Sequence, residues 1–243
     1  MSAERYIYAV KLSSHIPRDS YLWDIPAIAW LSEEGELPIN SAVTFLVGEN
    51  GSGKSTLLEA VAVACGFNAE GGSRNFSFST ADTHSELCEH ITAVRGAVRP
   101  ADGFFLRAES FYNAASYLDS LPMGGVRYGE KSLHEQSHGE SFLSLVKYRF
   151  KGKGLYLLDE PEAALSPSRL LTLLSCIHDL VEDGSQFIIA THSPILMAYP
   201  DAEILSLSEE GICPIDYRQT EHYQITKRFL ESPERMMKIL FNK

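Results

Sequence analysis

The sequence is poor in cysteine, has no excess of basic residues and contains no long apolar run, and each absence excludes a class of protein. The four cysteines form no CxxC pair, so neither a disulfide framework nor a cysteine zinc site is expected. Lys and Arg total 21 against 32 Asp and Glu, and the formal net charge of −11 argues against non-specific nucleic-acid binding by the surface as a whole. No run reaches the roughly 18 apolar residues of a membrane span.

The composition does contain enough apolar material for a sizeable core. The chain has 243 residues, of which 44% are hydrophobic and 22% charged, as in proteins that form one large domain or two small ones. No internal repeat or long Pro/Gly/Ser linker divides it, so residues 1–243 are predicted to form a single domain. The amino terminus, MSAERYIYAV, lacks the basic-then-apolar order of a signal peptide, and a cytoplasmic location is expected.

Short apolar runs alternate with stretches of helical periodicity. Residues 42–47 (AVTFLV), 155–159 (LYLLD) and 186–190 (QFIIA) have the length and composition of buried strands. Helical patterns follow the first two, and Gly184 is placed to close the second helix. The alternation predicts an α/β fold with a mainly parallel sheet flanked by helices, and with ligands at the carboxyl ends of its strands.

Three further segments are candidate strands. Residues 103–108 (GFFLRA) fit the parallel part of the sheet. Near the amino terminus, residues 6–10 and 27–31 carry a weaker pattern of the same kind. These two segments are predicted to form a small antiparallel edge.

A phosphate-binding loop follows the first buried strand. Residues 48–56 read GENGSGKST and fill every fixed position of the GxxxxGK[ST] template. Glycine is needed where the backbone turns tightly and aims its N–H groups at phosphate oxygens, and the helix that follows adds its positive dipole end. Lys54 supplies a charge for the β- and γ-phosphates, and Ser55 a hydroxyl for Mg²⁺. The predicted nucleotide-binding residues are Gly48, Glu49, Asn50, Gly51, Ser52, Gly53, Lys54, Ser55 and Thr56.

Two adjacent carboxylates, Asp159 and Glu160, end a strand that is otherwise apolar. In a protein with a phosphate loop, the first can hold Mg²⁺ while the second accepts a proton from an attacking water. Pro161 then stops the strand. The sequence therefore predicts Ser55 and Asp159 as metal ligands and Glu160 as a catalytic base.

Together these motifs resemble an ATP-binding-cassette (ABC/SMC-like) P-loop ATPase over about residues 42–195. GENGSGKST is similar to the Walker A loop and LYLLDE to the Walker B strand, with Glu160 at the place of the catalytic glutamate. Residues 160–166 (EPEAALS) resemble the D-loop, although Ser166 stands where an aspartate is usual. The resemblance also implies that His192, in THS after the strand QFIIA, is the switch histidine that touches the γ-phosphate.

The signature of that family, LSGGQ, has a degenerate match in QSHGES. Ser137, Gly139 and Glu140 take the places of the serine, the second glycine and the glutamine, about twenty residues before Asp159. An apolar stretch of helical character follows, whose amino-terminal dipole can face a phosphate. In the family this segment reaches the γ-phosphate held by a second subunit, so the resemblance implies a head-to-tail homodimer with two composite ATP sites.

The same residues also spell HEQSH, a literal match to the HExxH zinc-protease motif formed by His134, Glu135 and His138. That motif needs both histidines on one continuous helix and a third ligand further along. Gly139 and the neighbouring glycines favour a helix that starts only after the segment. Zinc catalysis is therefore not the preferred interpretation.

Other partners are weighed on weaker signals. Transporter cassettes place a coupling glutamine between the Walker A helix and the signature, yet none occurs there, and Glu109 is a possible replacement. SMC-type proteins insert a long coiled coil, but residues 57–136 show no sustained heptads. Alternating basic residues before the Walker B strand leave nucleic-acid contact open, although a solvated surface is favoured. These basic residues are Lys147, Arg149, Lys151 and Lys153.

The resulting hypothesis is a soluble, stand-alone ABC-type ATPase that binds ATP and Mg²⁺ and acts as an ATP-driven dimerisation switch for an unidentified partner. One alternative is the nucleotide-binding subunit of a membrane transporter. Another is an ATP-sensing module with little turnover, against which Glu160 argues.

Overall fold

A computed structural model describes residues 5–73, 85–107 and 137–241 of the chain. Its main feature is a six-stranded sheet with the order β5-β6-β7-β3-β8-β9. The first five strands in that order run parallel, and only β9 is antiparallel to its neighbour. The strands are β3 (Val43–Val47), β5 (Asp102–Arg107), β6 (Gly154–Asp159), β7 (Gln186–Ala190), β8 (Glu203–Ser208) and β9 (Gly211–Pro214). The predicted α/β class and mainly parallel sheet are confirmed.

The central strands β3, β6 and β7 are buried along their whole length. Such strands are covered on both faces, which explains why their sequences are continuous apolar runs rather than alternating ones. Successive residues belong to different cores: Leu157 and Ile188 pack with α2 (Lys54–Ala64), whereas Leu158 and Ile189 pack with the helices of the opposite face. Those helices are α4 (His138–Arg149), α5 (Pro167–Glu182) and α6 (Pro194–Met197).

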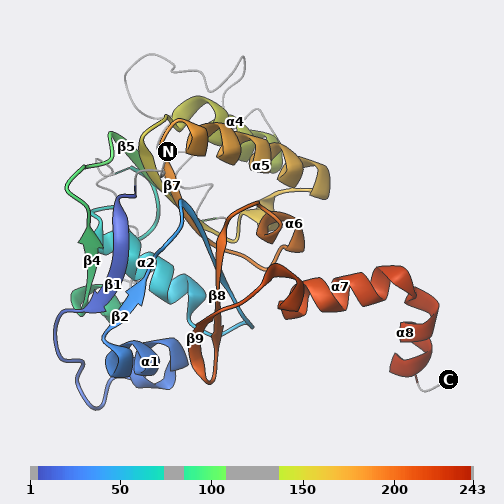
Figure 1. Ribbon diagram of the computed structural model, residues 1–243, viewed down its shortest axis with the longest axis horizontal. Coiled ribbons are helices and arrows are strands. Elements are labelled where there is room, and N and C mark those ends of the chain that lie inside the picture. The colour runs from blue at the N-terminus through green and yellow to red at the C-terminus, as the bar shows by residue number, and fades with distance from the viewer. Residues whose placement is uncertain (1–4, 74–84, 108–136, 242–243) are drawn as a thin grey trace.

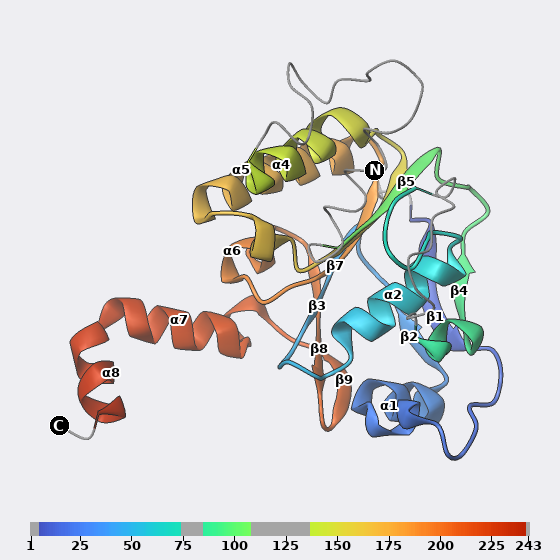
Figure 2. The ribbon, with the colours of Figure 1, turned by 180° about the vertical axis from the view of Figure 1, so that it is seen from behind.

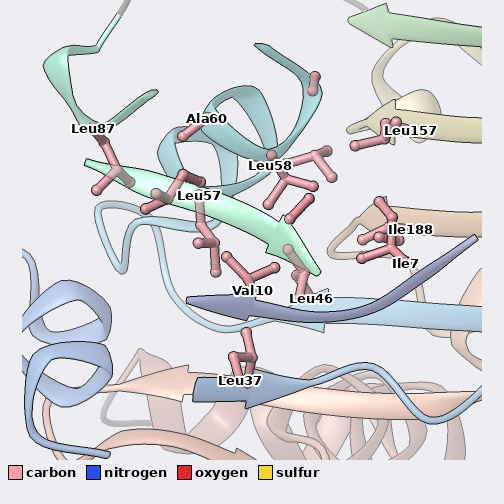
Figure 3. Packing of buried hydrophobic residues seen from close by; sticks show 14 of the residues in the cluster. Ile7, Val10, Leu37, Leu46, Leu57, Leu58, Ala60, Leu87, Leu157 and Ile188 are labelled. Carbon is pink, nitrogen blue, oxygen red and sulfur yellow. The ribbon is translucent and has the colours of Figure 1, made fainter. Parts of the chain in front are cut away.

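A second, antiparallel sheet contains β2 (Glu36–Pro38), β1 (Ile7–Leu12) and β4 (Ile91–Arg95), in that order. Helix α2 lies between the two sheets, and Figure 3 shows Leu57 and Leu58 in the same core as residues of both. Buried Gln186 ties the sheets together, because its amide accepts the N–H groups of Tyr6 and Ile7 and donates to the Ile7 carbonyl.

The prediction of a strand over residues 27–31 is wrong. The segment lies within helix α1 (Pro26–Glu34), which begins with proline at its first position and ends at Gly35 in the left-handed conformation (φ 78°). The antiparallel part is therefore a separate sheet built around β1, with β2 and β4 as its neighbours. Gly184, by contrast, follows the end of α5 with φ 79°, as its position in the sequence suggested.

The last two helices leave the body of the molecule. Figures 1 and 2 both show α7 (Glu221–Glu231) and α8 (Pro233–Leu240) projecting away from the sheets. Short 3₁₀ turns connect other elements: η1 (Tyr21–Asp24), η2 (Glu86–Glu89), η4 (Pro161–Ala164) and η5 (Tyr217–Gln219). Within the described ranges, no helix is both long enough and apolar enough to cross a bilayer.

Candidate functional site

The phosphate loop joins the carboxyl end of β3 to the start of α2, as its motif predicts. Two of its glycines are required by close contacts. A Cβ on Gly48 (φ 146°) would lie 2.2 Å from the carbonyl oxygen of Leu207, and one on Gly53 (φ 93°) would lie 2.4 Å from the Ile25 side chain. The loop thus passes too close to β8 and to the start of α1 for any other residue at these two places.

A cavity of about 710 Å³ opens beside this loop. Residues 47–52 form one wall, and residues 206–210 from the β8–β9 hairpin and 220–222 from the start of α7 form others. The contribution of the hairpin and of α7 has no counterpart in the sequence motifs. A pocket of this size accommodates a ligand of several hundred daltons.

The start of α2 offers hydrogen-bond donors that its own sequence leaves unused. Its N-cap residue is Gly53, which has no side chain to accept from the first turn, and no acidic residue lies in that turn. The hydroxyl of Ser52 is buried and has no partner among the described residues. Such a helix start fits an anion supplied from outside, and a phosphate group meets that requirement.

Lys54 is almost fully buried, with 4% of its surface exposed. Its ammonium group donates to the carbonyl oxygens of Gly48 (2.9 Å) and Glu49 (2.7 Å). Burial lowers the pKa of Lys54, while the nearby carboxylates Glu160, Asp159 and Glu162 act in the opposite direction. The lysine is therefore folded back onto its own loop, in reach of the place where phosphate oxygens would sit.

Ser55 and Asp159 meet at the end of β6. The Ser55 hydroxyl donates to Asp159 Oδ1 at 2.9 Å, which joins the two motifs that the sequence separates by about a hundred residues. Hydroxyl and carboxylate oxygens are ligands that Mg²⁺ accepts, with substrate phosphate and water completing its shell. This pair fits such an ion. Among the described residues, no group of three or more His, Cys, Asp or Glu side chains is arranged to hold a metal alone.

An arginine that no motif indicated also reaches this corner. Arg107, at the end of β5, lies 3.5 Å from Asp159 Oδ2 through its Nε and donates to Glu59 at 2.6 Å. Glu59 is on α2, so the arginine connects the helix to the edge of the sheet. It also supplies a positive charge beside the carboxylate predicted to hold the metal.

Glu160 has an unusual backbone conformation. Its φ and ψ are 48° and 52°, in the left-handed region, and its N–H donates to the Ala190 carbonyl at the end of β7 (2.9 Å). A non-glycine residue held this way is strained by about 1 to 3 kcal/mol, a feature common at functional sites. The turn carries the Glu160 side chain to 3.4 Å from Nε2 of His192 while leaving it 40% exposed.

His192 lies at the centre of a small polar cluster. Its backbone N–H donates to Glu162 Oε1, and its Nδ1 is 2.9 Å from Nε2 of His222 on α7. Burial lowers the pKa of both histidines and raises the pKa of Glu162. Two of these residues, Glu162 and His222, carry no predicted role in the sequence motifs. Glu162 stood within the D-loop segment two positions after Glu160, whereas His222 had no local signal.

The predicted signature residues lie elsewhere. Ser137 is the N-cap of α4, and its N–H and hydroxyl both donate to Glu140 Oε2, at 3.0 and 2.7 Å. Gly139 is required by space, since a Cβ there would meet the Ala164 carbonyl at 2.8 Å. None of these three residues lines the cavity at the phosphate loop. Within one chain, the structure does not bring the signature and the loop together.

The structure describes only part of the HEQSH segment and all of the alternating basic residues. His134, Glu135 and Glu109 lie outside the described residues. Ser137 has extended backbone angles (φ −62°, ψ 154°) and α4 begins at His138, so no continuous helix runs through the HEQSH segment. The helix starts inside that segment rather than after it. Among the alternating basic residues, Arg149 pairs with Asp102 at 2.8 Å.

Two family models match parts of the chain, and curated proteins resemble it over similar stretches. A family model described as an AAA domain matches residues 27–103, and one described as an AAA domain, putative AbiEii toxin, Type IV TA system, matches residues 132–198. The ribose import ATP-binding protein RbsA of Bacillus cereus is 26% identical over 173 residues, which cover 60% of this chain and 34% of that protein. UvrABC system protein A of Clostridium tetani is 33% identical over 112 residues, covering 44% and 12%. The chain thus matches about a third or less of these relatives' length.

Solved structures share the architecture over almost the whole chain. A nucleotide-free ATP-binding cassette from an ABC transporter superposes with a TM-score of 0.50 at 18% identity, over 95% of this chain and 97% of that one. CbiO1 from Clostridium perfringens, part of the transporter complex cbiONQ, has a TM-score of 0.50 at 17% identity, over 98% and 100%. The fold is therefore that of ATP-binding cassettes. With the AAA-domain matches and the cassette relatives, the chain is similar to ABC-type P-loop ATPases.

Proposed function

We propose that the chain binds and hydrolyses Mg·ATP and that its ATP-bound form pairs head to tail with a second copy. The observation that carries this proposal is the meeting of Ser55, Asp159, Glu160 and His192 at the carboxyl ends of β3, β6 and β7. Three segments that the chain keeps far apart converge on the start of α2. Their chemistry is that of a metal-assisted phosphoryl transfer to water.

Each side chain has a definite task in this proposal. The N–H groups of the loop and of the first turn of α2 bind the β- and γ-phosphates, and Lys54 exchanges its loop carbonyls for phosphate oxygens. Mg²⁺, when bound, neutralises charge that develops on the phosphates. Glu160 takes the proton of the attacking water, for which its partly exposed carboxylate is accessible. His192 donates from Nε2 to the γ-phosphate.

The proposal includes a second copy because the ATP site formed by one chain lacks the signature residues. Ser137 and Gly139 lie outside the cavity formed by the phosphate loop, so they serve the site only from a neighbouring subunit. A head-to-tail pair provides two such composite sites. ATP then stabilises the dimer by binding between the subunits, and hydrolysis releases it.

Glu160→Gln tests the hydrolysis. The amide keeps the shape of the side chain but cannot take a proton, so phosphate release should fall by about 10² to 10⁴ while ATP affinity stays within a factor of two. Glu234→Gln on α8 is the matched control and should leave turnover unchanged. A wild-type protein that releases no phosphate above background, even at high concentration, would instead support the ATP-sensing alternative.

A transporter subunit is the second candidate, because the relative at 26% identity is named as a ribose import protein and the fold is that of transporter cassettes. The two proposals differ in what the protein needs. A stand-alone ATPase turns over ATP with no other protein present and stays in the supernatant when cells are fractionated. A transporter subunit sediments with the membranes of the cells that produce it.

A further inference from the structure

The contact between His192 and His222 joins the nucleotide site to α7. The two ring nitrogens are 2.9 Å apart, and the rings meet edge to face with centroids 4.9 Å apart. His222 lines the cavity beside the phosphate loop, although it lies thirty residues after His192 in the chain. No motif of the proposed ATPase reaction includes it.

The position of His222 is set by a cap. Thr220, only 2% exposed, is the N-cap of α7. Its hydroxyl donates to the Tyr217 carbonyl at 2.8 Å and accepts the Tyr223 N–H at 3.4 Å. His222 therefore stands in a first helical turn whose start is held on both sides of the cap, and its imidazole is presented to His192 in one orientation.

The neighbouring groups determine which ring nitrogen carries the proton. A bond between two neutral imidazoles needs one donor and one acceptor. Burial lowers the pKa of both rings and the positive charge of Lys54 acts in the same direction, which favours their neutral forms. On its other side, Nε2 of His192 is buried, makes no hydrogen bond within the described residues and lies 3.4 Å from Glu160 Oε1, which is an acceptor. This arrangement favours a proton on Nε2 of His192, so that its Nδ1 accepts and Nε2–H of His222 donates.

We propose that His222 is a positioning residue that holds His192 in the Nε2–H tautomer, with that N–H aimed at the γ-phosphate position. Without the donor, His192 can move its proton to Nδ1 and would then turn a lone pair toward Glu160 and the phosphate oxygens, where only a donor is stabilising. A partner that fixes the tautomer of a catalytic histidine is a familiar device, and here it comes from a histidine on a late helix. Only the consequence for turnover rests on the proposed ATPase activity.

Nitrogen-15 NMR of the histidine side chains tests the tautomer directly, in the full chain and without nucleotide. In the wild type, His192 should be protonated at Nε2. His222→Phe removes the donor and should shift His192 to a mixture containing the Nδ1–H form. His222→Gln places an amide N–H near the same point and should restore the wild-type signature, and His178→Phe on α5 is the control that leaves it unchanged. His222→Ala replaces the Phe variant if that variant does not fold.

Turnover supplies the second readout. His222→Phe should lower kcat by about 10- to 100-fold with ATP affinity within about twofold of wild type, and His222→Gln should recover most of the loss. A purely structural role would not be rescued by Gln. If His192 keeps Nε2–H in the Phe and Ala variants, the inference is overturned. If the NMR result holds but the wild type releases no phosphate, the positioning role stands and the proposed hydrolysis fails.

Discussion

Two helix starts in this molecule carry motifs of phosphate-binding segments, and they are built in opposite ways. The first turn of α2 follows Gly53 and has neither a capping side chain nor an acidic residue. The first turn of α4 has a complete capping box in which the Glu140 carboxylate accepts from Ser137. The start of α2 therefore has no anionic group of its own, whereas the start of α4 already binds the Glu140 carboxylate.

The cations beside the two helix starts also differ in what they bind. At α2, the ammonium group of the buried Lys54 donates to two carbonyl oxygens, which a phosphate can replace. At α4, Arg169 binds the Glu140 carboxylate at 3.1 Å and lies 3.4 Å from the Ser137 hydroxyl. A phosphate presented by a second copy must therefore displace Glu140 before it can use Ser137. The comparison predicts that the proposed nucleotide binds strongly at α2, and that the proposed contact at α4 is weaker and exchangeable.

Lys54→Ala removes the cation at the start of α2 and should cause the largest effect, a loss of affinity for Mg·ATP. At least two charge-assisted hydrogen bonds to phosphate are lost, each contributing about 1.5 to 3 kcal/mol, so affinity for Mg·ATP falls at least tenfold by titration calorimetry. Lys238→Ala on α8 should bind as the wild type does. Undiminished affinity in Lys54→Ala would show that the start of α2 is not the phosphate site.

Ser137→Arg tests the proposed dimer contact at the start of α4, because Ser137 does not line the cavity beside the phosphate loop. In a Glu160→Gln background, the protein should be a dimer in Mg·ATP and a monomer in ADP by light scattering. Adding Ser137→Arg places a long charged side chain in the interface and should return the protein to monomer, with the ATP affinity of the single subunit nearly intact. Thr92→Arg, on the exposed side of β4, should leave the dimer in place. A dimer that forms equally with and without ATP would contradict the two-subunit site.

Glu140→Gln removes the carboxylate charge from the start of α4 and so tests whether that charge weakens the proposed dimer. Its amide oxygen can still accept from Ser137, but the like charge that opposes an arriving phosphate is gone. In the Glu160→Gln background, the dissociation constant of the ATP-dependent dimer should fall by about two- to tenfold, as measured by sedimentation. Loss of the exposed ion pair with Arg169 should cost less than about 1 kcal/mol of folding stability. A weaker dimer would mean that the carboxylate itself is part of the interface.

Ser137→Ala should have the smallest effect when it is measured on the single chain without nucleotide, where the hydroxyl serves as the cap of α4. Removal of an N-cap hydroxyl lowers the free energy of unfolding by about 1 kcal/mol, which urea denaturation can detect. Ser137→Thr keeps the hydroxyl and should stay close to wild type. Equal stability of the Ala and wild-type proteins would show that the capping box contributes nothing to α4.

Local patterns predicted most of the central fold and one part of the site. The strands β3, β6 and β7 were recognisable because central parallel strands are buried on both faces and must be apolar throughout. The phosphate loop was recognisable because its glycines, lysine and serine act within nine consecutive residues. Residues 27–31 were mispredicted because a short apolar run suits either a strand or a helix, and Pro26 and Gly35 decide for a helix.

The sequence by itself therefore determined the parallel sheet, the loop and the carboxylate pair, since each depends on neighbours along the chain. Only the tertiary structure decided which distant groups meet them. Arg107 reaches Asp159 because β5 lies beside β6 in the sheet, and His222 reaches His192 because the start of α7 lines the cavity. Such contacts follow from strand order and helix placement, which the packing of the whole core sets and no local spacing encodes.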